Sequence, residues 1–263
     1  MKKRQRLRKP YRVKKKESVI GNRFFWLAFL VLIILGGIFY LIYFSFTFQI
    51  KEVQISGNEK ISKEILLAFV KEQTDNKILF FSSRSIFLVN SDKTKESFLK
   101  EFPEIVQINL KKDFPDIVRV EIEERRPVAV FCQLENCFFI DKTGIIYEKF
   151  IGENYQILKI RNLIISKEVK IGERAVEEEK LIQILDIESK LKIHEIQLQE
   201  TGLVTEERLN VKTAEGWEIY FNPREDINWQ LTELELILKE KLLLEKRGSL
   251  EYIDLRFSRV YYK

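Results

Sequence analysis

The feature that most constrains this chain is an apolar run without a single charge, residues 24–48. A bilayer core of about 30 Å needs about 20 helical residues, so the run is long enough to span it. It has no polar stripe, unlike a soluble core helix. Trp26 near one end, and Tyr40 and Tyr43 near the other, are typical of interfacial aromatic belts. A cleaved signal peptide would be shorter and would end in small residues, which residues 44–48 do not provide. We therefore predict an uncleaved transmembrane helix over residues 24–48.

The distribution of charge predicts the orientation of this helix. Residues 1–23 hold eleven Lys or Arg and one acid, Glu17, so this tail carries +10. The net charge of the chain is +5, which leaves −5 for the remainder. By the positive-inside rule the tail is cytoplasmic and residues 49–263 lie outside the cytoplasm. We interpret the tail as a topology signal that also attracts anionic lipid. Nucleic-acid binding is the alternative, but the tail has one aromatic residue and the remainder is acidic.

The residues after the apolar run predict a small module of strand, helix, helix, strand and strand. Strand segments alternate apolar and polar residues, and each helix begins after a serine that can cap it. One amphipathic sheet must cover its apolar face, and two helices can do so. The expected ranges are a strand at 49–56, helices starting at Ser62 and Ser91, a looser stretch at 76–89, and strands at 106–110 and 118–123.

The rest of the chain predicts a second domain with a mostly antiparallel sheet and two covering helices. The helices are expected at 175–191 and 227–246, each with a face of leucine and isoleucine. The fold class is therefore α+β, with a single N-terminal transmembrane helix before the two domains. The expected strands are 127–132, 137–140, 145–149, 156–160, 193–199, 208–213, 217–221 and 250–257, with 260–262 as a further candidate.

The two cysteines, Cys132 and Cys137, flank a polar connection between two apolar segments that read as a hairpin. Directly opposed residues in an antiparallel pair have Cα atoms about 4.5–5.5 Å apart, which a disulfide can bridge. An extracytoplasmic location would permit oxidation. We predict a disulfide, and the alternative is two separate buried thiols.

A search for catalytic chemistry finds little. His194 is the only histidine, and we interpret it as a surface or structural residue in the strand at 193–199. One histidine and two cysteines cannot build a usual zinc site. No glycine-rich phosphate loop or nucleophile elbow occurs. Acid pairs such as Glu206–Glu207 lie in solvated, charge-rich segments, which disfavours a wall hydrolase with two carboxylates. We expect no catalytic residue, no metal and no cofactor.

Several segments of the chain resemble motifs of known protein families. The strand–helix–helix–strand–strand module resembles a POTRA domain, which mediates protein contacts. The segment that follows it resembles the Glu-Arg-x-Pro-hydrophobic-Ala signature of the FtsQ/DivIB cell-division family, and residues 140–147 resemble that family's hydrophobic-Asp-x-x-Gly segment. Residues 252–257 and 260–262 resemble its last strands. The matching motif residues are Glu124, Arg125, Pro127, Asp141 and Gly144.

The resemblance implies a non-catalytic scaffold of the division septum in the cell membrane. It implies small bitopic partners, an FtsL-like protein and an FtsB-like or DivIC-like protein, and a link from early cytoplasmic division proteins to septal peptidoglycan synthesis. It implies domains at 1–23 (tail), 24–48 (helix), 49–124 (POTRA) and 125–263 (β domain). A membrane-anchored protein that binds or hydrolyses the cell wall is the alternative.

In that family a partner adds a strand to the sheet edge at the last strand, where unpaired backbone groups are available. Ile253 and Leu255 alternate with the candidate contact residues, so we expect them in the core. The resemblance implies these partner-binding residues: Tyr252, Asp254, Arg256, Phe257, Val260 and Tyr261.

Overall fold

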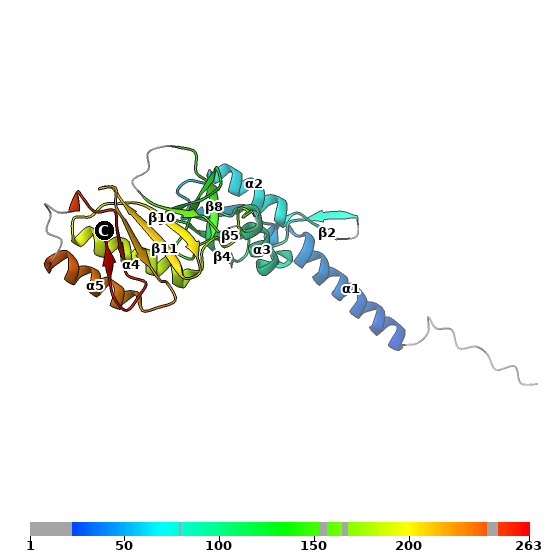
Figure 1. Cartoon of the computed structure of the whole chain (residues 1–263). Helices are drawn as coiled ribbons and strands as arrows, with labels where there is room; N and C mark the ends of the chain where they lie inside the picture. Colours follow the sequence, from blue (N-terminus) through cyan, green and yellow to red (C-terminus); the bar gives the residue numbers. More distant parts are fainter. Residues whose placement is uncertain (1–22, 79, 153–156, 165–167, 241–246) are drawn as a thin grey trace, which may run out of the picture. The chain divides into compact units, whose positions relative to one another are not determined.

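A computed structural model describes residues 23–78, 80–152, 157–164, 168–240 and 247–263 (Figure 1). The predicted cytoplasmic tail therefore lies almost wholly outside the described residues. The chain divides into two compact units, which we treat separately. The anchor unit comprises Met1–Gln54, Ala68–Val89 and Lys112–Arg119, and the sheet unit comprises Ile55–Leu67, Asn90–Lys111 and Val120–Lys263.

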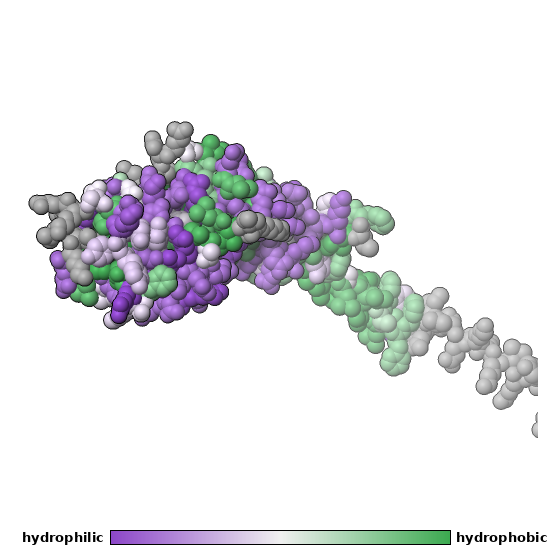
Figure 2. Space-filling model, viewed as in Figure 1, coloured by the Kyte–Doolittle hydropathy of each residue, from purple (hydrophilic) through white to green (hydrophobic). Residues whose placement is uncertain are grey.

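The apolar run forms helix α1 (Arg23–Phe44), whose side chains are all outside any protein core. In the described part of the chain it is the one helix long and apolar enough to cross a membrane. Its surface is hydrophobic along its length (Figure 2). The helix ends at Phe44, earlier than predicted, because the Ser45 hydroxyl accepts a hydrogen bond from the Thr47 N–H and starts a separate 3₁₀ turn, η2 (Phe46–Phe48).

The predicted order of strand, helix, helix, strand and strand is confirmed. The strands form a sheet in the order β1-β5-β4. The looser stretch between the helices contains a short hairpin, β2 with β3, and a 3₁₀ turn, η3 (Ile86–Leu88). The second helix is capped by Asn90, not by Ser91, since the Asn90 side chain accepts the Lys93 N–H at 3.1 Å. The bounds are β1 (Glu52–Ser56), α2 (Lys63–Thr74), β2 (Asn76–Ile78), β3 (Phe81–Ser83), α3 (Ser91–Glu101), β4 (Ile105–Asp113) and β5 (Ile117–Glu124).

The second domain is built on a nine-stranded sheet in the order β14-β13-β12-β11-β10-β9-β6-β7-β8. Three neighbouring pairs are parallel, β6–β9, β9–β10 and β12–β13, and the other pairs are antiparallel, so the prediction of a mostly antiparallel sheet is confirmed. The bounds are β6 (Ala129–Gln133), β7 (Asn136–Ile140), β8 (Ile146–Lys149), β9 (Leu158–Asn162), β10 (Leu198–Thr205), β11 (Arg208–Thr213), β12 (Glu218–Phe221), β13 (Tyr252–Asp254) and β14 (Tyr261–Tyr262).

Helices α4 (Glu178–Ile193) and α5 (Ile227–Glu240) pack on the same face of this sheet. The core joins their leucines and isoleucines to inward side chains of the strands, among them Phe131 and Phe221, and to Trp217 just before β12. A smaller cluster of Val130, Cys132, Phe139 and Tyr147 lies on the opposite face. The C-terminal end predicted for the second helix, residues 241–246, lies outside the described residues.

The predicted strand at 193–199 is wrong at its start. Helix α4 continues to Ile193, and His194 is its C-cap residue. Glu195 then turns the chain with a φ of 60°, and strand β10 begins only at Leu198. Ile196 and Leu198 are two residues apart, as in a strand, but Ile193 and Ile196 are three apart, a spacing that fits a helix end followed by a turn.

Cys132 and Cys137 lie directly opposite each other in the β6–β7 pair and form a disulfide, with Cα atoms 4.1 Å apart. Strand β6 is hydrogen-bonded on both sides, to β7 and to β9. The sheet therefore holds this hairpin independently of the covalent bond.

Replacing both cysteines by serine should lower the free energy of unfolding by about 1–2 kcal/mol, because a bridge across so short a loop removes little entropy from the unfolded chain. Circular dichroism in increasing denaturant measures this change, and wild-type protein under reducing conditions serves as the control. Loss of the native β-sheet spectrum without denaturant would contradict the expected secondary role of the disulfide.

Candidate interaction surface

The large sheet ends at β14, which pairs antiparallel with β13. The Lys263 N–H donates to the Tyr252 carbonyl at 3.1 Å, and the Glu251 N–H donates to the Lys263 carbonyl at 2.6 Å. Strand β13 is therefore enclosed between β12 and β14. Of the predicted strand over residues 250–257, only Tyr252–Asp254 is a strand, β13. The edge of the sheet is the next strand, β14.

The backbone of β14 points hydrogen-bonding groups outward. In an antiparallel pair, residues alternate between those that bond to the facing strand and those that bond away from it. Lys263 bonds to Tyr252 in the facing strand, and Tyr262 is opposite Ile253, so the Tyr262 N–H and carbonyl point away from β13. This residue offers a donor and an acceptor to a further strand.

The other edge of the sheet is different, because the chain itself covers part of β8. The Ile146 N–H donates to the Glu173 carbonyl at 3.0 Å, and the Gly172 N–H donates to the Ile146 carbonyl at 2.7 Å. At β14, in contrast, the side chains of Tyr261 and Tyr262 are 53% and 45% exposed. Unpaired edges are the places where another chain can add a strand, so β14 is the better candidate.

Side chains in register form a row on the sheet face that points away from α4 and α5. Asn210, Tyr220, Asp254 and Tyr261 are successive partners across β11, β12, β13 and β14, and we call them the outward row. Beside this row the Tyr220 ring stacks on Tyr252, with centroids 5.6 Å apart. Tyrosines and arginines of this kind dominate the energetics of protein interfaces.

Asp254 of the outward row forms a two-point ion pair with Arg256, whose Nε and Nη2 lie 2.9 and 2.7 Å from the Asp254 carboxylate. Burial raises the pKa of Asp254, but the hydrogen bonds and charge of Arg256 outweigh it, so the pKa lies below its ordinary value. The same carboxylate raises the pKa of Arg256. Arg256 is thus already paired, and its remaining N–H groups are the ones available to another molecule.

Four of the six predicted partner-binding residues, Asp254, Arg256, Phe257 and Tyr261, are linked by direct contacts, and Tyr252 joins them through Tyr220. Phe257 meets Tyr261 edge-on, with ring centroids 6.1 Å apart, and the Arg256 guanidinium lies 5.3 Å from the Phe257 ring. Val260 differs, because it is half-buried against the core shared with the helices. Ile253 and Leu255 are buried, as expected from their alternation with the contact residues.

Sequence reasoning missed two residues that complete this surface. Arg208 in β11 lies over the Tyr220 ring, 4.6 Å from its centroid, and neither was singled out. The signal for Tyr220 was its polar-face position in the alternating segment 217–221. Its proximity to β13 could not be read from the sequence, because the β12–β13 pair is parallel and α5 intervenes between the two strands.

A groove of about 380 Å³ lies between the start of α5 and residues 255–258. Trp229, 62% exposed, contributes an apolar surface to it, and Arg256 and Phe257 join it to the outward row. Its acidic lining residues are Glu225, Asp226 and Glu233. The groove is suited to a peptide segment with apolar and basic side chains.

The predicted motif residue Glu124 organises the entry to helix α2. Its carboxylate accepts three successive backbone N–H groups, from Glu59 at 2.9 Å, Lys60 at 2.8 Å and Ile61 at 3.0 Å. Successive N–H groups of this kind form a concave anion site. The acid of the motif is therefore structural.

Arg125 connects the end of the first module to the start of the second domain. Its backbone N–H donates to the Glu104 carbonyl at 2.7 Å, and its Nε donates to the Pro103 carbonyl at 2.9 Å. Its Nη1 forms an ion pair with Asp141 in which the two side chains are 13% and 4% exposed. Pro127 follows in the short connection between β5 and β6. Proline has no backbone N–H, and outside a strand this interrupts no sheet hydrogen bonds.

Asp141 closes the turn between β7 and β8. Its Oδ1 accepts the Thr143 N–H at 2.9 Å, the Thr143 hydroxyl at 2.7 Å and the Ile145 N–H at 3.1 Å. Burial raises the pKa of Asp141, but these hydrogen bonds and the charge and hydrogen bond of Arg125 outweigh it, so the pKa lies below its ordinary value. Gly144 has a φ of 76°, and a Cβ there would lie 1.9 Å from the Val176 carbonyl oxygen, so only glycine fits.

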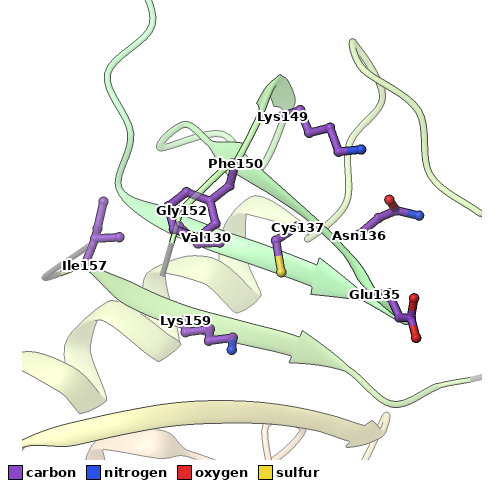
Figure 3. A pocket seen from close by; sticks show the side chains of 9 residues that line it. All are labelled: Val130, Glu135, Asn136, Cys137, Lys149, Phe150, Gly152, Ile157 and Lys159. Atoms are coloured by element: carbon purple, nitrogen blue, oxygen red, sulfur yellow. The ribbon is translucent and has the colours of Figure 1, made fainter. Parts of the chain in front are cut away.

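A second cavity of about 420 Å³ lies beside the disulfide, on the sheet face opposite the helices (Figure 3). Lys149, Lys159 and Glu135 line it, together with Val130 and Phe150. Among the described residues no group of three or more His, Cys, Asp or Glu side chains could hold a metal ion. Neither observation assigns a reaction to this face.

Two family descriptions match the chain. "POTRA domain, FtsQ-type" matches residues 48–125, and "Cell division protein FtsQ/DivIB, C-terminal" matches residues 131–256. The matches include the βααββ module, the turn at Asp141 and strand β13, whereas β14 lies beyond them. No curated protein sequence matches the chain.

Replacing Asp141 by Asn should lower the free energy of unfolding at neutral pH by about 3 kcal/mol, because it leaves the mostly buried Arg125 without its counter-ion. Because the pKa of Asp141 is lowered in the folded protein, the contribution of its carboxylate to the free energy of unfolding depends on pH. It is fully present above the unfolded-state pKa of about 4 and is lost as the pH falls through the lower folded-state pKa. The difference between wild type and variant should therefore shrink upon acidification.

Glu59→Gln is the matched control, because it removes an ion pair with Arg126 whose side chains are 66% and 82% exposed. Its effect should stay below about 0.5 kcal/mol. Denaturant titrations at several pH values measure both variants. Equal destabilisation by the two would refute the structural role assigned to Asp141.

Proposed function

Because the chain belongs to the FtsQ/DivIB family of cell-division proteins, we propose that it is a non-catalytic scaffold that gathers small bitopic partners at the division septum. The family assignment covers a role in cell division. The scaffold role is the finer proposal, and it links early cytoplasmic division proteins to septal peptidoglycan synthesis. The observation that carries it is the open sheet edge at β14 beside the outward row.

The proposed topology has a cytoplasmic N-terminus and an extracytoplasmic bulk. The +10 charge of residues 1–23 supports it through the positive-inside rule. The Cys132–Cys137 disulfide supports it because such bonds persist outside the reducing cytoplasm. The proposed division of the chain is a tail at 1–23, a membrane segment at 24–48, a POTRA domain at 49–124 and a β domain at 125–263.

We place the partner strand next to β14. The outward N–H and carbonyl of Tyr262 give the partner backbone two hydrogen bonds, as in other cases of strand addition to a sheet edge. Tyr261, at the β14 end of the outward row, and Phe257, whose ring contacts it, then meet alternate side chains of the added strand. This placement refines the expectation that β13 receives the partner, since β14 already occupies that side of β13.

The groove at α5 supplies a second contact of different chemistry. Its three acids attract basic side chains, and Trp229 offers a ring to apolar ones. The free N–H groups of Arg256 suit an acidic or carbonyl group on the added strand. The expected partner is therefore an FtsB-like or DivIC-like protein, bound together with an FtsL-like protein, whose extracytoplasmic end combines an extended segment with basic and apolar residues.

Replacing Tyr262 by Pro tests the proposal, because proline removes the outward N–H while the bonds of Lys263 to β13 remain. Losing one hydrogen bond should weaken partner binding about five- to tenfold. Tyr262→Phe is the matched control, since it keeps the backbone and should bind as wild type does. Full-length protein in detergent, titrated with the small bitopic division proteins of the source organism, gives the affinities.

Two results would contradict the proposed function. One is wild-type protein that binds none of these partners although its circular dichroism shows a folded domain. This result would favour a wall-binding or wall-hydrolysing protein instead. The other is an unchanged affinity for Tyr262→Pro, which would leave the partners in place but exclude strand addition at β14.

A further inference from the structure

The anchor unit exposes aromatic side chains around the end of the membrane helix that the fold leaves uncovered. Among the described residues of this unit, Phe80 is 96% exposed and Phe46 is 76% exposed. Together with Phe81, Phe87 and Phe114, which are 65%, 43% and 58% exposed, we call them the aromatic collar. Figure 2 shows a hydrophobic surface on α1 and at the tip of the β2–β3 hairpin. Exposed apolar groups that gather in one place mark an interaction surface.

The hairpin is fastened to the last turn of α1 by hydrogen bonds. The Ser85 hydroxyl donates to the Ile42 carbonyl at 2.7 Å, and the Ser83 hydroxyl donates to the Tyr43 carbonyl. The Gln49 side-chain amide also donates to the Tyr43 carbonyl, at 3.0 Å. These carbonyls have no partner within the helix because they lie at its C-terminal end. Ser83, at the end of β3, and Ser85, just after the hairpin, therefore cap the membrane helix.

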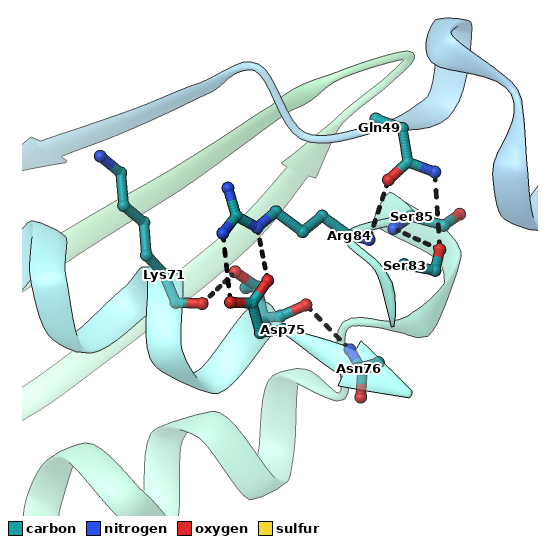
Figure 4. A network of polar contacts seen from close by, with 8 residues as sticks. Gln49, Lys71, Asp75, Asn76, Ser83, Arg84 and Ser85 are labelled. Carbon is teal, nitrogen blue, oxygen red and sulfur yellow. Dashed lines mark hydrogen bonds and ion pairs between the residues drawn. The ribbon is translucent and has the colours of Figure 1, made fainter. Parts of the chain in front are cut away.

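A second set of contacts stiffens this cap (Figure 4). The Gln49 side-chain oxygen accepts the Arg84 N–H at 2.8 Å. The Arg84 guanidinium forms an ion pair with Asp75, with Nη2 at 3.1 Å from Oδ2. The segment 83–85 is thus held to the end of α2 as well as to α1. The hairpin cannot swing freely about the helix end.

Ring contacts make the collar continuous with the helix. Phe81 of β3 meets Phe44, the last residue of α1, with ring centroids 6.0 Å apart. Phe48 contacts Phe87 at 5.2 Å, and Phe87 contacts Phe114 at 5.3 Å. The collar therefore begins where the membrane-spanning helix stops.

We propose that the aromatic collar is a second membrane contact, in which the β2–β3 hairpin places Phe80 and Phe81 in the lipid bilayer beside α1. Ser83 is level with the Tyr43 carbonyl, which lies in the predicted interfacial belt. A strand advances about 3.3 Å per residue, so Phe80 can reach about 10 Å beyond Ser83. That reach is enough to bring the ring from the headgroup region to the acyl chains. Aromatic rings are enriched at this depth.

Lipid is the occupant because of where the collar is attached. A surface hydrogen-bonded to the last turn of a membrane helix cannot leave the bilayer surface, whereas a protein partner would have to displace lipid to reach it. A lysine also lies in this hairpin. Lys77 in β2 is exposed and faces Ser82 of β3, whereas the Lys51 ammonium over the Phe46 ring is already paired with Asp116. An exposed lysine such as Lys77 pairs with a lipid phosphate while neighbouring rings insert.

The test is the depth of a nitroxide on full-length protein in vesicles of phosphatidylcholine and phosphatidylglycerol. Single variants Phe80→Cys, Ile151→Cys and Leu32→Cys are labelled with the native disulfide kept oxidised. Ile151 is 88% exposed in the sheet unit and is the aqueous reference, and Leu32 in α1 is the bilayer reference. Phe80 is so exposed that its replacement leaves the fold intact. Collision with dissolved oxygen and with a water-soluble nickel chelate is measured by electron paramagnetic resonance.

The expected result is a loss of nickel accessibility at position 80, with oxygen accessibility close to that at position 32. Nickel accessibility at position 80 equal to that at position 151 would overturn the proposal. A label at position 80 shielded from both reagents would also overturn it, because it would show a protein cover in place of lipid. Nickel access at position 32 would show that α1 does not lie in the bilayer, and this result would also overturn the proposal. None of these outcomes depends on division partners.

Discussion

The mostly buried ion pair between Arg125 and Asp141 is the constraint on which the arrangement of the sheet unit depends. Arg125 also holds the carbonyls of Pro103 and Glu104, while Asp141 holds the turn that begins β8. Strand β6 starts just after Arg125, and the order of the sheet runs from β6 through β9 and β10 to the edge at β14. Burying an ion pair costs desolvation free energy, and removing one partner costs more because the other charge stays buried alone. The pair therefore favours the chain arrangement in which Arg125 and Asp141 meet. The family motif thus joins the first module to the second domain, and the edge strand β14 lies six strands from β6 in the same sheet.

The two faces of the sheet, and its two edges, are covered to different extents by the rest of the chain. Helices α4 and α5 cover one face, which leaves tyrosines and an arginine on the other. The chain covers part of β8 with residues 172–173 but ends the opposite side with two exposed tyrosines. Natural sheets blunt edges that must not pair. The open edge beside Tyr220, Tyr252 and Phe257 is for this reason the place where we propose that a partner binds.

Helices and strands could be predicted from the sequence where neighbouring residues form a clear hydrophobic pattern. The apolar run predicts α1, and the alternation of residues 106–110 and 118–123 predicts β4 and β5. Prediction from the sequence failed where a local bond overrides the pattern. Ser45 ends the helix before Phe48, and the Asp254–Arg256 pair bends the chain where alternation predicted a strand to residue 257. The surface around Tyr220 could not be predicted either, since it depends on the parallel β12–β13 pair, and pairing between strands distant in sequence leaves no periodic trace.

Hydrogen bonds fix the membrane helix to the first elements that follow it, and among the described residues the edge strand β14 turns the N–H and carbonyl of Tyr262 outward. The proposed function depends on the outward groups of Tyr262. The most direct measurement is amide hydrogen exchange of the full-length protein with and without its bound bitopic partners. We expect exchange to slow at the Tyr262 amide and its neighbours in β14, while the buried amides of β6 and β9 stay unchanged. Protection confined to other strands, with β14 exchanging as fast as in the free protein, would contradict it.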